Sequence, residues 1–215
     1  DVVYLAASDF TTPLTLFALD LNVMELTVMR RQPQQFVSDG IEVRQFWAVS
    51  SDGERIPYFY VGKNAAPDTP TLVYAYGGFG VPELPHYLGS IGKYWLEEGN
   101  AFVLANIRGG GEFGPRWHQA AQGISKHKSV DDLLAVARDL SERGMSSPKH
   151  IGLQGGSNGG LITAAAFVRE PQSIGALVCE VPLTDMIRYP LLSAGSSWTD
   201  EYGNPQKYEV CKRWL

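Results

Sequence analysis

The sequence predicts an α/β fold in which a parallel sheet carries helices on both faces. Residues 71–76 and 101–107 are continuous apolar runs, as is typical of strands that are buried on both sides. Residues 130–143 carry apolar side chains at helical spacing, and apolar strands are expected at residues 150–154 and 176–181. Strands that alternate with helices in this way favour parallel pairing through right-handed crossovers.

The first 35 residues have a different pattern. Residues 2–6, 14–19 and 26–29 are short strand-like runs separated by turn residues. Such short strands do not bury both of their faces alone. We therefore expect residues 1–35 to belong to a larger β structure, and a separate domain to occupy residues 36–215.

The elements between these regions have local signals of their own. Two strands are expected within residues 43–61, because Asp52-Gly53 is a strong hairpin signal between them. A polar linker with prolines follows, and residues 91–98 have helical periodicity. For the helix at residues 130–143, Ser129 is the expected N-cap and Asp132 its capping-box partner.

Composition excludes several classes of function. A net charge of −5 gives no reason to expect nucleic acid or an anionic membrane as a partner. The two cysteines fit neither a zinc pattern nor a disulfide framework, so no metal is expected. With no signal sequence visible, we expect a cytoplasmic protein, with the periplasm as the alternative.

Gly155-Gly156-Ser157-Asn158-Gly159 reads G-x-S-x-G and falls between an expected strand and an expected helix. A nucleophilic serine at a sharp strand-to-helix turn requires this context. The dipole of the following helix favours negative charge near Ser157, and the backbone N–H of Asn158 is placed to bind an oxyanion. The alternative is a glycine-rich turn that contains a serine by chance.

A second glycine motif competes with the first. Residues 109–114 match G-x-G-x-x-G, and the acidic pair Asp131-Asp132 follows about 20 residues later, as a dinucleotide site requires. Those aspartates open a helix, however, whereas a ribose-binding carboxylate belongs at the end of a second strand. We therefore expect no cofactor, and interpret Arg108 and Glu112 as an ion pair across the loop.

Four stretches together resemble the prolyl oligopeptidase family of serine peptidases: YAYGGFG (74–80), NIRGGGEFGPRWH (106–118), SPKHIGLQGGSNGGL (147–161) and WTDEYG (198–203). Their order and spacing also match. The resemblance implies an α/β-hydrolase fold, incomplete at its C-terminal side, over residues 36–215. Residues 8–21 resemble the last propeller segment before that domain, so residues 1–35 are interpreted as a β-propeller remnant.

The resemblance also implies roles for individual residues. Ser157 would be the acylated nucleophile, and Tyr76 would add its hydroxyl to the oxyanion hole beside the Asn158 N–H. The pocket for the residue before the scissile bond would be lined by Phe79, Leu183, Trp198 and Tyr202.

An aromatic pocket suits a proline ring, whereas a basic residue would need carboxylates. The Y-G-G-F form also fits the proline-specific branch of the family. Leu183 is bulkier than the residue often found at this place, which bears on pocket size. The alternative for Trp198 and Tyr202 is packing in the core.

The catalytic acid and base are the parts that the sequence lacks. In this fold the triad runs Ser, Asp or Glu, then His, yet all four histidines precede Ser157. The resemblance places both missing residues beyond Leu215, and Asp185 and His118 are interpreted as structural. We expect a truncated chain without peptidase activity of its own, which binds the missing half of its domain or associates with itself through an open sheet.

Two other functions remain open. An esterase or a peptidase of different specificity could use the same fold. A non-catalytic interaction module could retain the serine turn after losing its base.

Overall fold

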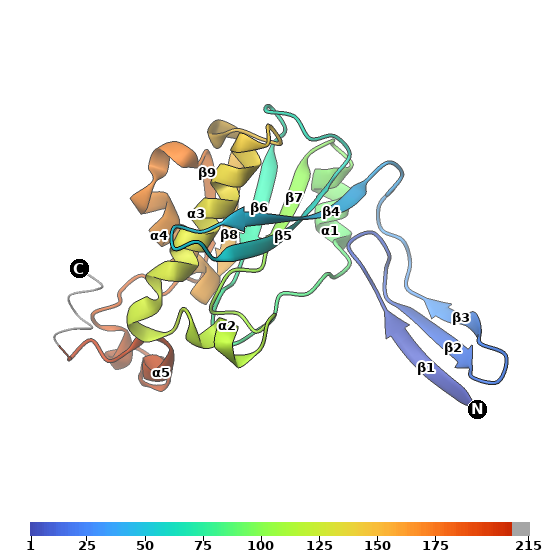
Figure 1. The fold of residues 1–215 in the computed structure, drawn as a ribbon, viewed down its shortest axis with the longest axis horizontal. Helices are drawn as coiled ribbons and strands as arrows, with labels where there is room; N and C mark the ends of the chain where they lie inside the picture. Colours follow the sequence, from blue (N-terminus) through green and yellow to red (C-terminus); the bar gives the residue numbers. More distant parts are fainter. Residues whose placement is uncertain (208–215) are drawn as a thin grey trace.

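In the computed structural model, which describes residues 1–207, the chain forms two sheets. The smaller is antiparallel and consists of β1 (Val2–Ala7), β2 (Thr15–Asp20) and β3 (Glu25–Arg31), in that order. Figure 1 shows this sheet, in blue, projecting from the rest of the molecule at its N-terminal end. The stretch at residues 207–215, which also has an amphipathic helical pattern, lies almost entirely outside the described residues.

The larger sheet has the order β4-β5-β7-β6-β8-β9. Its strands are β4 (Glu42–Val49), β5 (Arg55–Gly62), β6 (Thr71–Ala75), β7 (Ala101–Ala105), β8 (Ile151–Gly156) and β9 (Ala176–Glu180). The last four pair in parallel, as predicted, whereas β4 and β5 are antiparallel and make the sheet mixed. The predicted hairpin between β4 and β5 is confirmed, with Gly53 in the left-handed region at φ 86°.

Helices cover both faces of this sheet, as the sequence predicts (Figure 1). On one face lie α3 (His127–Glu142) and α4 (Asn158–Arg169); on the other lie α1 (Gly89–Ile91) and the π-helical turn η1 (Gly92–Leu96). The remaining helical segments are α2 (Pro115–Gln119), α5 (Thr199–Tyr202), η2 (Gly123–Ser125), η3 (Pro148–His150), η4 (Pro171–Ser173), η5 (Tyr189–Leu191) and η6 (Gly195–Trp198).

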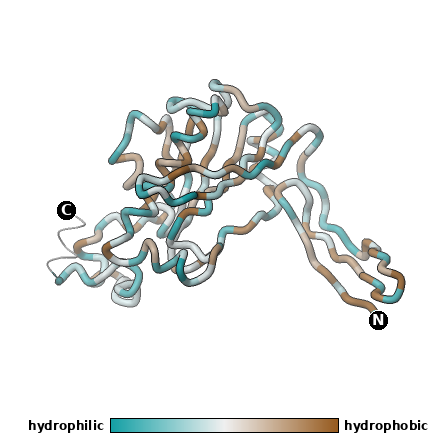
Figure 2. The backbone as a smooth tube through the Cα atoms, viewed as in Figure 1, coloured by the Kyte–Doolittle hydropathy of each residue, from teal (hydrophilic) through white to brown (hydrophobic). Residues whose placement is uncertain are grey.

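The core follows the alternation of side chains along the central strands. Val73 and Val103 point into the cluster with α3 and α4, while their neighbours Phe102 and Leu104 point into the cluster with Leu96. Figure 2 shows the resulting concentration of hydrophobic residues along the central strands. A sheet buried on both faces explains the continuous apolar runs of the sequence.

The predicted N-cap of α3 is wrong. The helix begins at His127, so Ser129 lies inside its first turn, and the Ser129 hydroxyl donates to Arg108 O at 2.7 Å. Asp132 does not close a capping box, because its carboxylate accepts hydrogen bonds from Arg108. Both side chains that the local pattern assigned to a cap therefore form tertiary hydrogen bonds instead.

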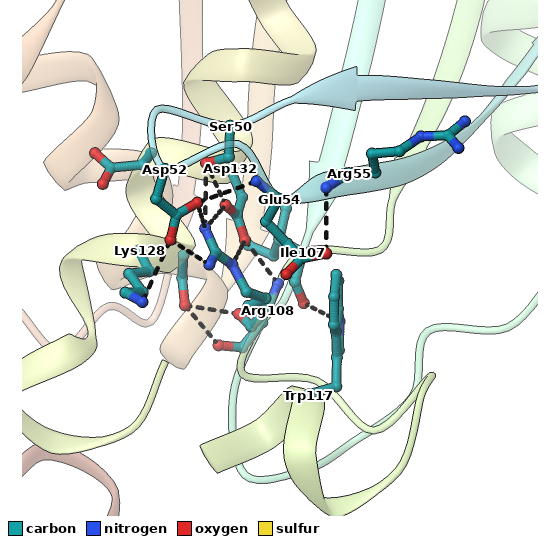
Figure 3. Close-up of polar contacts among 12 residues, drawn as sticks. Ser50, Asp52, Glu54, Arg55, Ile107, Arg108, Trp117, Lys128 and Asp132 are labelled. Atoms are coloured by element: carbon teal, nitrogen blue, oxygen red, sulfur yellow. Dashed lines mark hydrogen bonds and ion pairs between the residues drawn. The ribbon is translucent and has the colours of Figure 1, made fainter. Parts of the chain in front are cut away.

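Arg108 is the centre of a buried polar network (Figure 3). Its guanidinium donates to both oxygens of Asp132, with Nε–Oδ2 at 2.9 Å and Nη2–Oδ1 at 2.6 Å, and its backbone N–H donates to Oδ2 at 3.0 Å. Nη1 and Nη2 of the guanidinium also donate to Asp52 of the β4–β5 turn. The Ser50 hydroxyl donates to Asp132 at 2.6 Å. The network ties α3, the hairpin turn and the loop after β7 together.

The expected ion pair between Arg108 and Glu112 is therefore absent. Glu112 turns the other way and accepts hydrogen bonds from Glu83 N at 3.0 Å and from Asn106 Nδ2 at 3.3 Å. Burial raises the pKa of the Glu112 carboxyl, despite these hydrogen bonds. The glycine loop is thus held from both sides, but by different partners.

Phe10 and Phe36 connect the small sheet to the main body. Phe10 lies between β1 and β2, is almost fully buried, and packs 5.5 Å from the ring of Phe59, measured between centroids. Phe36 follows β3 and stacks on Tyr87 with centroids 5.3 Å apart. The strands β1 and β3 themselves are exposed along their length.

None of the helices in residues 1–207 combines the length and hydrophobicity that crossing a bilayer requires.

Replacement of Asp132 by alanine should strongly destabilise the protein, because it leaves the buried Arg108 guanidinium with one of its two carboxylate partners. We expect a loss of about 3–5 kcal/mol in the free energy of unfolding, measured by guanidinium denaturation. Asp131→Ala is the matched control, since the neighbouring Asp131 pairs with Arg169 at the surface and should cost about 1 kcal/mol or less. Equal losses for the two variants would contradict this account.

Candidate active site around Ser157

Ser157 occupies the sharp turn between β8 and α4. Its φ of 54° and ψ of −115° are unusual for a residue with a side chain, and α4 begins at the next residue. The backbone N–H of Ser157 donates to Glu180 O of β9 at 2.9 Å, and Ser157 O accepts from Leu161 N at 3.1 Å. The predicted strand–turn–helix geometry at residue 157 is confirmed.

Glycines make this turn sterically feasible. A Cβ on Gly155 would lie 2.5 Å from the backbone of Gly159, and one on Gly159 would lie 2.5 Å from Ala75 O. A Cβ on Gly160 would approach Glu180 O to 2.9 Å. Gly156 differs, since a Cβ there would meet only ordinary contacts at 3.8 Å. Backbone therefore packs directly against backbone on one side of the turn.

Asn158 connects the turn to the loop that follows β6. Its side chain is completely buried, with Nδ2 donating to Tyr76 O at 2.5 Å and Oδ1 accepting from the Tyr202 hydroxyl at 3.0 Å. Its backbone N–H belongs to the first turn of α4, where no intrahelical acceptor exists. Asn158 thus supplies a free N–H beside Ser157 from a rigidly held residue.

Tyr76 lies directly after β6 and faces Ser157. Burial is the main cause that raises the pKa of its phenol, and the charges of Glu201 and Glu83 raise it further. A hydrogen bond with the Ser157 side chain works in the opposite direction. The net effect keeps the phenol protonated at neutral pH, so that it can act as a hydrogen-bond donor next to the serine.

A cavity of about 350 Å³ opens in front of Ser157. Two of the four predicted pocket residues, Leu183 and Trp198, line it together with Ser157. Pro182, Tyr189 and Leu192 contribute further apolar surface. Asp185 also borders the cavity, but Arg188 Nε donates to its carboxylate at 2.6 Å. The cavity is therefore lined mainly by apolar side chains, with Ser157, Thr184, Ser193 and the paired Asp185 carboxylate as its polar members.

The structure places the other two predicted pocket residues beside this cavity and not in its wall. Tyr202 is fully buried and meets Phe79 edge to face, with ring centroids 5.7 Å apart. It also meets Tyr189 edge to face at 5.6 Å. Phe79 is partly exposed and has a φ of 56°. Tyr202 thus supports both Tyr189 of the wall and Asn158 of the turn.

A buried ion pair behind the site was not anticipated from the sequence. Lys126 Nζ donates to Glu201 Oε1 at 2.6 Å and to Gly77 O at 2.9 Å, and His118 Nε2 lies 2.6 Å from the second oxygen of Glu201. Burial alone would raise the pKa of Glu201, but Lys126 and the hydrogen bond from His118 leave it below its usual value. No local pattern signals this pairing, because its members lie 75 residues or more apart.

None of the chain's four histidines, all of which lie within residues 1–207, has a hydrogen bond to Ser157. His86 and His127 contact backbone carbonyls, and His150 lies 2.9 Å from the Ser147 hydroxyl. His118 is occupied by Glu201, and Asp185 by Arg188. The described residues thus bring Ser157, the Asn158 N–H and the Tyr76 hydroxyl to one cavity, and none of the four histidines is hydrogen-bonded to the serine.

Comparisons with known proteins found a matching family and chains of similar sequence and fold. The profile described as "Prolyl oligopeptidase family" matches residues 88–214. The chain is 42% identical to an uncharacterized peptidase, y4nA, of Sinorhizobium fredii over 95% of its length, and 30% identical to a prolyl endopeptidase of Elizabethkingia meningoseptica, also over 95%. A solved post-proline cleaving enzyme from Rickettsia typhi superposes with a TM-score of 0.92 at 39% identity, over 99% of the chain.

The chain is much shorter than these relatives. It spans 29% of the length of each of the two curated proteins and 31% of the solved chain.

Gly159→Ala should damage the site, because the new methyl group would have to lie 2.5 Å from Ala75 O. We expect a loss of about 2–3 kcal/mol in the free energy of unfolding, measured by denaturant titration. Gly156→Ala, three residues away in the same motif, is the control and should change stability by about 1 kcal/mol or less. If Gly159→Ala were as stable as Gly156→Ala, the backbone contact would not be limiting.

Proposed function

Since the chain belongs to the prolyl oligopeptidase family of serine peptidases, we propose that it is the nucleophile-bearing part of a peptidase that cleaves after proline. The observation that carries the proposal is Ser157, which is held in a left-handed conformation at the strand–helix turn and faces a largely apolar cavity with Trp198 in its wall. The full-length protein is taken to be a chain of the relatives' length that contains these residues.

In the proposed reaction the Ser157 hydroxyl attacks the carbonyl carbon of the scissile bond and loses its proton to a general base. The carbonyl oxygen becomes an oxyanion, which accepts hydrogen bonds from the Asn158 N–H and the Tyr76 hydroxyl. The protonated base then gives its proton to the leaving amine, and the acyl group stays on Ser157. Water, deprotonated by the same base, releases the acyl group and restores the serine.

We propose that the base is a histidine beyond residue 215, oriented by an acid that also lies there, in the chain order Ser, Asp or Glu, His. An unassisted serine hydroxyl is a poor nucleophile. The expectation that the 215 residues alone do not turn over peptides therefore stays a prediction. The Ser157 hydroxyl, the Asn158 N–H and the Tyr76 hydroxyl would already be in position, so that only the base would have to be added.

The apolar cavity supports a proline ring as its occupant. Trp198 and Leu183 offer flat and branched apolar surface, and the one bordering carboxylate, Asp185, already pairs with Arg188. A basic side chain would need a carboxylate that is free to pair with it. Direct ring contact by Phe79 and Tyr202 remains a prediction, because in this structure both lie beside the cavity.

The small N-terminal sheet and a hollow on the large sheet both offer surfaces for contact with further protein. We propose that residues 1–35, with the exposed strands β1 and β3 on either side of β2, form the last part of a β-propeller. Leu72, Ala176 and Val178 line a second, apolar hollow of about 400 Å³ on the large sheet. That hollow supports docking of the rest of the domain or of a second copy of the chain.

A cytoplasmic location stays a prediction.

The alternatives follow from the same fold. An esterase would keep Ser157 and the oxyanion donors but show no preference for proline. An interaction module would have an unactivated serine that does not react with a fluorophosphonate probe.

Ser157→Ala in the full-length protein should abolish both peptide turnover and fluorophosphonate labelling. Tyr76→Phe removes one oxyanion donor and should lower kcat about 100-fold or more. Tyr74→Phe is the matched control: it lies two residues earlier on β6, carries the same hydroxyl and should leave kcat within about twofold, because Tyr74 does not line the cavity. Fluorophosphonate labelling that persists in Ser157→Ala would contradict the assignment of Ser157 as the nucleophile.

Chromogenic reporters ending in Gly-Pro and Gly-Arg test the specificity. We expect the full-length protein to cleave after proline and not after arginine. Trp198→Ala should lower kcat/KM for the proline reporter about tenfold by removing the stacking surface. Tyr94→Ala, on the exposed side of η1, serves as the control and should have no effect. Faster cleavage after arginine than after proline would contradict the proposal.

A further inference from the structure

The carbonyl groups of Tyr76 and Gly77 belong to the two consecutive peptide groups that follow the Tyr76 Cα. Tyr76 O accepts from Asn158 Nδ2 at 2.5 Å, and Gly77 O accepts from Lys126 Nζ at 2.9 Å. Gly77 has a φ of +61°, and a Cβ there would lie 2.5 Å from the Ile107 side chain. Because glycine has the largest conformational freedom, these two hydrogen bonds restrict the two consecutive peptide planes that follow Tyr76.

Lys126 is an unusual donor for this purpose. Only 2% of the residue is exposed, so its ammonium has lost nearly all contact with solvent. Such a charge is tolerated in a protein interior when it is paired and hydrogen-bonded. Glu201 supplies that charge at 2.6 Å, and His118 occupies the other oxygen of the carboxylate.

Both donors are supported from one short helix. In α5, Glu201 binds Lys126, and the adjacent Tyr202 donates to Asn158 Oδ1 at 3.0 Å. Trp198 lies immediately before α5 and lines the cavity. The residues that hold the Tyr76 and Gly77 carbonyls are thus connected directly to the segment that forms the wall of the pocket.

We propose that Lys126, held by Glu201, is a positioning residue that fixes the Gly77 carbonyl and thereby places the Tyr76 hydroxyl to bind the oxyanion. This inference rests on the proposed peptidase function. Lys126 touches neither the substrate nor the reacting atoms, and it acts only through the Tyr76–Gly77 backbone. Removing its ammonium group should therefore impair transition-state stabilisation more than substrate binding.

Lys126→Met in the full-length protein tests this, with kcat expressed per active site as counted by fluorophosphonate titration. We expect kcat for the Gly-Pro reporter to fall about 10- to 100-fold, while KM changes by about threefold or less. Lys128→Met is the matched control: Lys128 lies two residues along, pairs with Asp52 at the surface and should leave both constants unchanged. A kcat within about twofold of wild type for Lys126→Met, or a loss confined to KM, would overturn the proposal.

Lys126→Met leaves Glu201 without its main countercharge, which could prevent folding. The double variant Lys126→Met/Glu201→Gln removes both charges and is expected to show a similar fall in kcat. Retention of wild-type kcat by this variant would also overturn the proposal.

A double-mutant cycle with Tyr76→Phe separates positioning from general structural support. If Lys126 acts through the Tyr76 hydroxyl, Lys126→Met should change kcat by about twofold or less once that hydroxyl is gone. The same 10- to 100-fold loss in the Tyr76→Phe background would show that Lys126 acts elsewhere. Failure of the peptidase function itself is recognised separately, because wild-type protein would then show neither turnover nor labelling.

Discussion

Direct contact between backbone segments at the carboxyl ends of β6, β7 and β8 is the constraint on which the site depends. Ala75 O lies where side chains on Gly155 or Gly159 would be, and Gly77 O lies where a side chain on Gly109 would be, at 2.2 Å from its Cβ position. At these glycines the loops after the three parallel strands meet backbone to backbone. This close approach brings Tyr76 to Ser157, because parallel strands end at the same edge of the sheet.

Buried polar groups hold these closely packed loops in place. Arg108 and Asp132 hold the loop after β7, and Lys126 and Glu201 hold the loop after β6. Ser129 Oγ donates to Arg108 O at 2.7 Å and lies 3.5 Å from Gly77 O, between the two networks. Buried ion pairs contribute little net stability, but they restrict groups to one arrangement when every partner is present. That property suits a site where positions matter more than stability.

Local patterns were sufficient to predict the strands, the turn at Ser157 and the helices on both faces. The turn was predictable because its glycines, its serine and the following helix lie within a few residues of each other. The partners of Arg108 and Lys126 were not, since they lie 24 to 75 residues away in sequence and depend on the folded topology. Ser129 and Asp132 show the same limit. Their spacing matches a capping box, but in the folded protein both side chains bind Arg108 instead. Leu183 and Trp198 were placed by family resemblance, which carries long-range information that composition and periodicity do not.

The attachment of the small sheet has a mechanical consequence. Phe10 lies in the connection between β1 and β2 and Phe36 follows β3, and both rings are buried in one cluster with Leu88 and Leu96. A side chain on Gly92 would lie 2.2 Å from the Phe36 ring, so η1 fits closely around it. Hydrogen bonds reinforce both anchors, since Leu88 N donates to Phe10 O at 3.2 Å and Gln35 N donates to the Tyr87 hydroxyl at 2.7 Å. Any shift of the small sheet against the main body would therefore expose at least one buried aromatic ring to solvent.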